Sequence, residues 1–228
     1  LYPVQLLAQI ATRVLFPLLS RVEDEARFRR AYLELSAAIA LVAAPIYVAM
    51  GALSEPLALA LLGPAWAGAA PLLAIFAPVG LFQALTNPTG LIYQARGRTD
   101  LLLAWGVGSS AVMVAAFVIG LPWGATGVAA AYALSMLVLA YPVFALPFRL
   151  IGLPVAALLR TLWPCLVCAA GMLIVLLAAR LALAALPPVA QLALALPAGL
   201  LVYLALSWWL NRAPLLACLR LVRPGGSA

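Results

Sequence analysis

Long apolar blocks, separated by short polar or proline-containing segments, dominate this sequence. About twenty apolar residues in a helix cross the ~30 Å hydrocarbon core of a bilayer. The blocks lack the alternation of apolar and polar residues that a membrane β-barrel needs. In lipid, the backbone must satisfy its own hydrogen bonds, so helices are the structure that remains. The sequence therefore predicts an all-α, polytopic transmembrane helical bundle of about six full spans, preceded by a partial N-terminal helix. The predicted spans are residues 31–53, 69–93, 101–120, 125–148, 161–183 and 189–210.

The composition agrees with this class of protein. Of the 228 residues, 68% are hydrophobic and the mean hydropathy is +1.18, which leaves too little polar surface to cover a soluble globule. The net charge is +7, and every cation is an arginine. A basic balance suggests nucleic acid as the partner of a soluble protein. In a membrane protein, an excess of arginine instead sets the orientation of the spans, so no nucleic-acid partner is predicted.

The segments between the blocks carry almost all of the charge. The stretch from Arg13 to Arg30 holds five arginines and three acids. If successive spans alternate in direction, only Arg180 of the 13 arginines approaches the second side of the membrane. Arginine-rich ends of spans face the cytoplasm. The sequence thus predicts a cytoplasmic charged loop at 21–30, a membrane domain of about six spans at 31–211 and a cytoplasmic tail at 212–228.

Residues 1–20 read as the end of a transmembrane helix with one polar face. Gln5, Gln9 and Arg13 recur at helical spacing. Polar side chains in the bilayer are costly unless they face protein or a water-filled cavity. Alternatively, Arg13 extends to the cytoplasmic surface while the two glutamines bond neighbouring helices. Both interpretations stay open. Because Leu1 already lies within apolar sequence, we expect the chain to begin inside this helix.

A second polar stripe lies on the predicted span 69–93. It contains Gln83, Thr86 and Asn87, continues to Gln94 and is interrupted by Pro88. A proline within a span frees a carbonyl and bends the helix, which can open a vestibule or simply fit a neighbouring helix. For this stripe, packing and interhelical hydrogen bonds are the favoured explanation.

Groups that could carry chemistry are scarce in the sequence. There is no histidine, and the acids are expected in loops or near span ends. Cys165 and Cys168 form a C-x-x-C inside an apolar span with no second pair, which predicts small buried side chains. We therefore predict no catalytic residues, no metal site and no cofactor, and the protein is not expected to be an enzyme. The acids are Glu23, Asp24, Glu25, Glu34, Glu55 and Asp100.

Four phrases resemble the polysaccharide transporter family, the Wzx-type lipid-linked oligosaccharide flippases of the MOP superfamily. They are RVLFPLLSRVEDEARFRRAY, LLGPAWAGAAPLL, YQARGRTDLLL and GLPWGATGVAAAYAL. The resemblance implies two six-helix lobes around a central cavity, with this chain as the C-terminal lobe plus two terminal helices. It also implies outward flipping of an undecaprenyl-pyrophosphate-linked oligosaccharide across the bacterial inner membrane, by alternating access, for surface polysaccharide synthesis.

The resemblance further implies roles and partners. Arg13 would neutralise the pyrophosphate, Gln5 and Gln9 would donate hydrogen bonds to sugars, and Gln83 and Asn87 would be further cavity-lining residues. The implied partners are the lipid-linked oligosaccharide, membrane lipids and an N-terminal lobe of the same polypeptide that this sequence lacks. A polysaccharide polymerase and glycosyltransferases are further expected partners. The C-terminus is expected in the cytoplasm.

Three other functions compete with the flippase. A MATE-like exporter of small organic cations would need an acid within the membrane, which this part of the chain does not offer. A membrane glycosyltransferase or ligase would need acids in a large extracytoplasmic loop, whereas the predicted outer turns are short. A non-transporting membrane scaffold would leave the polar stripes without a purpose.

Overall fold

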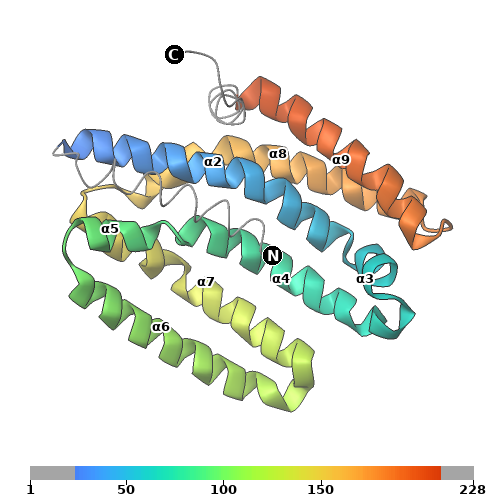
Figure 1. Ribbon diagram of the computed structural model, residues 1–228, viewed down its shortest axis with the longest axis horizontal. Helices are drawn as coiled ribbons and strands as arrows, with labels where there is room; N and C mark the ends of the chain where they lie inside the picture. Colours follow the sequence, from blue (N-terminus) through green and yellow to red (C-terminus); the bar gives the residue numbers. More distant parts are fainter. Residues whose placement is uncertain (1–23, 212–228) are drawn as a thin grey trace, which may run out of the picture.

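The computed structural model describes residues 24–211, and these residues form helices joined by short connections, with no strand among them. Helices follow one another back and forth across the bundle (Figure 1). The α-helices are α2 (Glu25–Ala52), α3 (Ser54–Leu62), α4 (Ala70–Thr86), α5 (Thr89–Ala95), α6 (Thr99–Gly120), α7 (Gly124–Leu150), α8 (Val155–Ala182) and α9 (Pro188–Leu210); the 3-10 helices are η1 (Pro64–Ala69) and η2 (Leu121–Trp123).

The long apolar helices confirm the predicted class of polytopic helical bundle. Within residues 24–211, five continuous helical stretches are long and apolar enough to cross a membrane. The longest, Thr99–Leu150, folds back at η2 into the antiparallel pair α6 and α7 (Figure 1). By contrast, the nine residues of α3 are too few to cross a bilayer.

The start of α2 differs from the charged loop predicted at 21–30. Asp24 is the N-cap, and its carboxylate accepts a hydrogen bond from the amide of Ala26 at 2.9 Å. An acidic cap and Glu25 in the first turn both stabilise a helix N-terminus. Residues 25–30 are therefore helical, whereas residues 21–23 lie outside the described residues. Local capping extends the helix beyond the apolar block that set the predicted boundary.

Helix α2 lies at the centre of the arrangement. It packs against α4 on one side and α8 on the other, while α9 covers α8 and the α6–α7 pair joins the bundle mainly through α7 (Figure 1). At the turn between α6 and α7, a Cβ atom added to Gly120 would lie 2.7 Å from the carbonyl oxygen of Gly127. The two backbones thus approach as closely as small residues allow in membrane helices.

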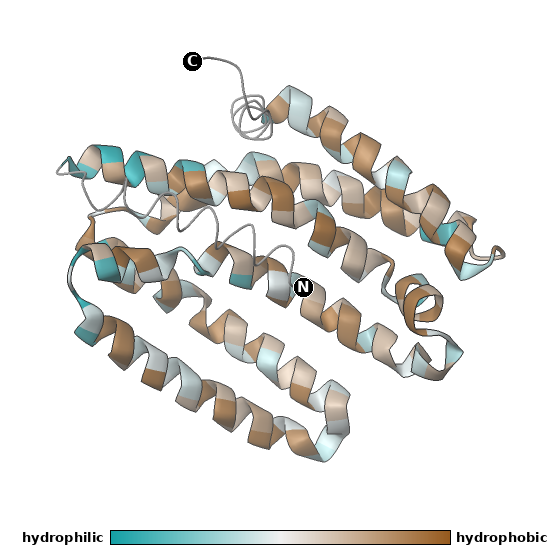
Figure 2. Ribbon diagram, viewed as in Figure 1, coloured by the Kyte–Doolittle hydropathy of each residue, from teal (hydrophilic) through white to brown (hydrophobic). Residues whose placement is uncertain are grey.

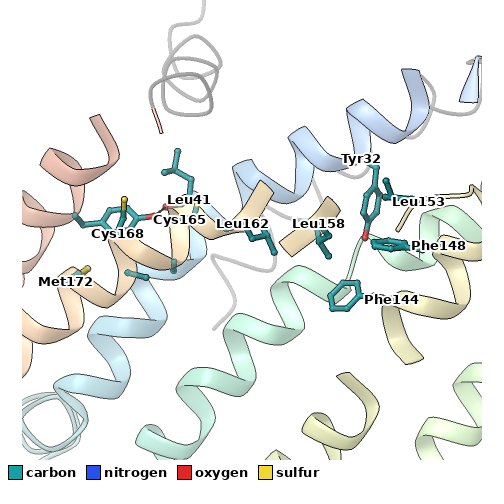
Figure 3. Close-up of a cluster of buried hydrophobic side chains, with 14 of the residues drawn as sticks. Tyr32, Leu41, Phe144, Phe148, Leu153, Leu158, Leu162, Cys165, Cys168 and Met172 are labelled. Carbon is teal, nitrogen blue, oxygen red and sulfur yellow. Dashed lines mark hydrogen bonds between the residues drawn. The ribbon is translucent and has the colours of Figure 1, made fainter. Parts of the chain in front are cut away.

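The buried core runs along the inner faces of α2 and α8. Near the start of α2, Tyr32 packs edge-to-face on Phe148 of α7, with ring centroids 5.4 Å apart (Figure 3). Farther along α8, Cys165 and Cys168 are both buried, in keeping with the sequence-based prediction (Figure 3). The carboxamide of Asn211 donates to the sulfur of Cys165 at 3.4 Å.

The outer surface of the bundle is apolar. Figure 2 shows hydrophobic residues along both α6 and α7, and Leu103, Leu137 and Val138 are each about two-thirds exposed. Apolar side chains exposed on helices of this length suit contact with lipid or with other membrane helices.

Candidate functional site

Two of the five predicted site residues fall within the described part of the chain. These are Gln83 and Asn87, both on the second predicted span. Gln5, Gln9 and Arg13 lie outside the described residues, and their proposed roles stay predictions.

Gln83 forms an interhelical hydrogen bond. Its side-chain amide donates to the hydroxyl of Tyr132 on α7, with 2.6 Å between nitrogen and oxygen. The ring of Tyr132 also contacts Phe76 of α4 and Phe117 of α6, with centroids 6.3 and 5.6 Å away. Such polar bonds between membrane helices contribute about 0.6 kcal/mol on average and up to about 1.7 kcal/mol. The amide of Gln83 is thus held by a cluster from three helices.

The sequence did not predict Tyr132 as a member of this site. The tyrosine lies 49 residues after Gln83 in an alanine-rich stretch. Only the packing of α7 against α4 brings the two side chains together.

Asn87 lies at a break in the helix. Helix α4 ends at Thr86, Pro88 follows, and α5 begins at Thr89. The hydroxyl of Thr86 donates to the carbonyl of Gln83 at 3.1 Å, and that of Thr89 to the carbonyl of Thr86 at 2.7 Å. The side-chain hydroxyls thus satisfy carbonyls where proline cannot continue the helical pattern. The predicted interruption at Pro88 is present.

The side chain of Asn87 is exposed, and it makes no hydrogen bond with the residues of 24–211. It lies one helical turn from Gln83, on the same side of the α4–α5 segment. An exposed carboxamide inside an apolar span is costly in lipid and is expected to face protein or a water-filled cavity. The stripe therefore combines the carboxamide of Gln83, which is bonded to Tyr132, with the exposed carboxamide of Asn87, which can bind a ligand.

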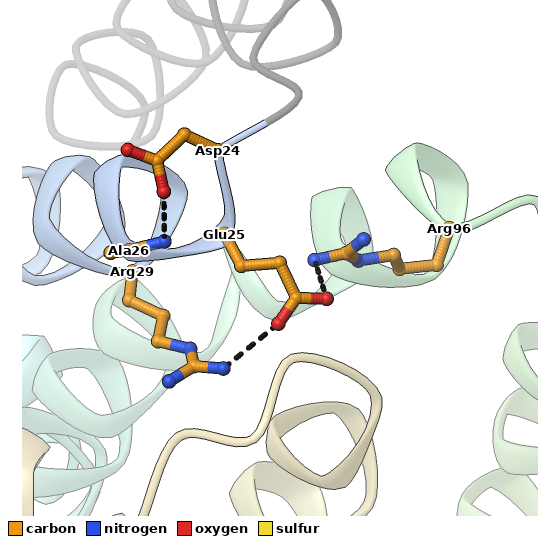
Figure 4. A network of polar contacts seen from close by, with 5 residues as sticks. All are labelled: Asp24, Glu25, Ala26, Arg29 and Arg96. Atoms are coloured by element: carbon orange, nitrogen blue, oxygen red, sulfur yellow. Dashed lines mark hydrogen bonds and ion pairs between the residues drawn. The ribbon is translucent and has the colours of Figure 1, made fainter.

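A polar cluster ties the start of α2 to the end of α5. The carboxylate of Glu25 contacts Arg29 at 2.9 Å and Arg96 at 3.3 Å (Figure 4). The guanidinium carbon of Arg96 also lies 5.6 Å from the centroid of the Phe28 ring. Exposed ion pairs contribute up to about 1 kcal/mol each, so this cluster positions α5 more than it stabilises the fold.

Arginines gather at this end of the bundle. Arg98, just before α6, pairs with Asp100 at 2.9 Å, and hydrogen bonding to that carboxylate raises the pKa of Arg98. Within residues 24–211, seven arginines lie at the end that contains Glu25, and only Arg180 lies at the opposite end. The seven are Arg27, Arg29, Arg30, Arg96, Arg98, Arg149 and Arg160.

The acidic and cysteine side chains of the described residues do not gather into a metal-binding cluster. Residues 24–211 hold no group of three or more His, Cys, Asp or Glu side chains that could bind a metal ion. Glu25 and Asp100 are ion-paired with arginines, and Asp24 caps α2. What the site offers chemically is hydrogen bonding by carboxamides and a hydroxyl.

Comparison with known proteins shows similarity to polysaccharide biosynthesis proteins. A family model described as polysaccharide biosynthesis protein matches residues 1–71, which include α2 and α3. Teichuronic acid biosynthesis protein TuaB of Bacillus subtilis is 34% identical over 107 residues, or 46% of this chain and 22% of TuaB. Over about half of its length, the chain is thus similar to proteins of polysaccharide biosynthesis.

Two further relatives are matched over similar shares of the chain. Lipopolysaccharide biosynthesis protein WzxC of Escherichia coli is 27% identical over 119 residues, covering 52% of this chain and 24% of WzxC. Amylovoran biosynthesis protein AmsL of Erwinia amylovora is 30% identical over 115 residues, covering 50% of this chain and 30% of AmsL. The matches thus span less than a third of each relative. No solved structure matches the chain significantly.

Proposed function

We propose that this protein is a polysaccharide transporter that flips a lipid-linked oligosaccharide from the cytoplasmic to the extracytoplasmic leaflet of the bacterial inner membrane. The observation that carries the proposal is the polar stripe of Gln83 and Asn87 on an otherwise apolar, interrupted span. The names of the relatives, which refer to teichuronic acid, lipopolysaccharide and amylovoran biosynthesis, support a glycan as the cargo.

The stripe suits the sugar part of such a substrate. Sugar hydroxyl groups both donate and accept hydrogen bonds, and carboxamides can do the same. The amide of Gln83 is held by Tyr132, which reduces the entropy lost when it binds a ligand. Asn87 is exposed and lies beside a helix break, where α5 can change its angle to α4. These features support a sugar-facing surface.

The pyrophosphate needs a different partner. Its charge cannot cross lipid unassisted, and an arginine is the side chain best suited to neutralise it. We assign this role to Arg13, with Gln5 and Gln9 on the same helical face as sugar ligands. These residues precede the described part, so the assignment rests on their sequence pattern and on the family.

Orientation follows from the charge distribution. The end with seven of the eight described arginines is assigned to the cytoplasm by the positive-inside rule. Helix α9 ends at Leu210 on that side, so the C-terminus is assigned to the cytoplasm as well. Alternating access requires two lobes that rock against each other, and the greater length of the relatives leaves room for a second lobe. We therefore expect no flipping by these 228 residues alone.

A genetic experiment tests the proposal. The parent gene is deleted, and lipid-linked oligosaccharide and surface polysaccharide are quantified after adding back wild type, Arg13→Ala or Asn87→Ala. Accumulation of the lipid-linked glycan and rescue by wild type support the flippase. Rescue by Arg13→Ala as well would make that residue an anchor only. No accumulation in the deletion strain would contradict the flippase and favour an exporter of small molecules.

A further inference from the structure

An isolated ion pair lies at the end of the bundle opposite the arginine-rich end. Arg180, near the end of α8, contacts the carboxylate of Glu55 on α3 at 2.6 Å. A second guanidinium nitrogen lies 3.5 Å from the carbonyl oxygen of Ala52, the last residue of α2. Within residues 24–211, Glu55 and Arg180 are the only charged residues at this end. Both side chains remain accessible, at 57% and 37% exposure.

The pair lines a small polar cavity. The cavity has a volume of about 290 Å³ and lies between α3, the end of α8 and the start of α9. Gln191 of α9 supplies its third polar side chain, and Leu59 and Pro188 belong to its apolar wall. This volume is near the lower limit of about 300 Å³ for typical small-molecule sites.

The other side of α3 is different. A larger groove of about 780 Å³ runs between α2, α3 and α9, and its lining residues are all apolar, including Leu57, Leu61 and Leu200. Such a groove suits hydrocarbon chains of the bilayer. Polar groups therefore concentrate on one side of this short helix, in the smaller cavity.

The polar groups of the cavity are balanced in charge and in hydrogen-bonding type. Glu55 accepts, Arg180 donates, and their charges cancel. The side-chain amide of Gln191 donates to the carbonyl of Leu186 at 2.9 Å, which fixes the carboxamide and leaves its oxygen as an acceptor. An anionic ligand would meet the carboxylate and a cationic ligand the guanidinium, so an uncharged ligand rich in hydroxyl groups fits best.

We propose that this cavity binds a neutral sugar residue on the extracytoplasmic side of the membrane. The sugar hydroxyls would accept from the guanidinium of Arg180 and donate to Glu55 and to the carboxamide oxygen of Gln191. The side of the membrane and the origin of the sugar in the transported glycan rest on the proposed function. The binding itself does not depend on transport.

Ligand-observed NMR on the full-length protein in nanodiscs tests this site. The probes are methyl β-D-glucopyranoside and methyl N-acetyl-β-D-glucosaminide, with glucuronate and glucosamine as the charged comparisons. We expect the neutral glycosides to bind more tightly than either charged sugar. The variant Gln191→Leu keeps the ion pair and should weaken neutral binding about five- to tenfold, the effect of one lost hydrogen bond. Thr99→Val, which removes an exposed polar group at the opposite end, should leave binding unchanged.

A second pair of variants separates binding from a purely structural role. The exchange Glu55→Arg with Arg180→Glu retains an ion pair but relocates its donors and acceptors. If this double variant has the thermal stability of wild type but no longer binds the glycosides, the site is supported. Unchanged binding in this double variant or in Gln191→Leu, or no binding of either neutral glycoside to wild type, would overturn it.

The two proposals can fail separately. Accumulated lipid-linked glycan in the deletion strain without glycoside binding in vitro retains the flippase and removes this site. Glycoside binding that Gln191→Leu weakens, without accumulation in the deletion strain, retains the site and removes the flippase.

Discussion

The hydroxyl of Tyr203 on α9 donates to the carbonyl oxygen of Leu41 on α2 at 2.9 Å, and both residues are buried. Four residues after Leu41, Pro45 lacks the backbone N–H that would normally bond this carbonyl. A carbonyl without a partner in the membrane costs several kcal/mol, so the tyrosine compensates for the proline across the bundle.

This relationship predicts a non-additive pair of substitutions. Tyr203→Phe removes the donor and leaves this buried carbonyl unpaired, so it should lower the free energy of unfolding by about 1–3 kcal/mol. In a Pro45→Ala background, the new backbone N–H can bond Leu41, so the same change should cost less. Unfolding in detergent, followed by tryptophan fluorescence, measures both costs. Equal costs in the two backgrounds would show that the tyrosine does not compensate for the proline.

Gly80 on α4 allows the closest approach to α2. A Cβ atom added there would overlap the ring of Tyr47, which is buried and has little room to move. Gly80→Ala should therefore lower the free energy of unfolding by about 1–3 kcal/mol through overpacking. Gly108→Ala, at a position with no neighbouring atom within 4 Å, is the control and should not be destabilising. Similar stability of both variants in detergent would argue against tight packing here.

Much of this architecture could be predicted from the sequence because apolar length determines a membrane span. The predicted spans match α2, the α4–α5 segment and α6 to α9, and the break at Pro88 follows from its missing N–H. The start of α2 was misplaced because capping by Asp24 acts beyond the apolar block. Hydropathy alone does not register such local hydrogen bonds.

Pairings between helices could not be predicted. Gln83 and Tyr132 are 49 residues apart, and Glu55 and Arg180 are 125 apart. A single sequence shows that a polar group needs a partner in the membrane, but the partner depends on which helix faces become neighbours. The sequence therefore indicated Gln83 and Asn87 as candidates without the tyrosine that holds the first of them.

Glu25 is predicted to hold the arginine-rich end of α5 in place. Glu25→Gln removes the ion pair with Arg96, which connects α2 to α5, and the pair with Arg29 within α2. Because exposed pairs contribute up to about 1 kcal/mol, we expect amide hydrogen exchange in α5 to speed up by up to about fivefold. The effect should shrink at high salt. Asp100→Asn breaks a pair that does not reach α2, and equal acceleration of α5 by this control would contradict the prediction.

The last prediction concerns the polar stripe and separates its two roles. Tyr132→Phe removes only the hydroxyl that accepts from Gln83 and keeps the ring between Phe76 and Phe117. Gln83→Leu removes the amide itself. If the amide binds sugar and the tyrosine positions it, restoration of surface polysaccharide by Gln83→Leu should fall up to about tenfold, the value of one hydrogen bond to a neutral ligand. Tyr132→Phe should cause a smaller loss, because the carboxamide remains. If Gln83 serves only to join α4 to α7, both variants should lose similar stability in detergent, and transport should fall only in proportion to the amount of folded protein.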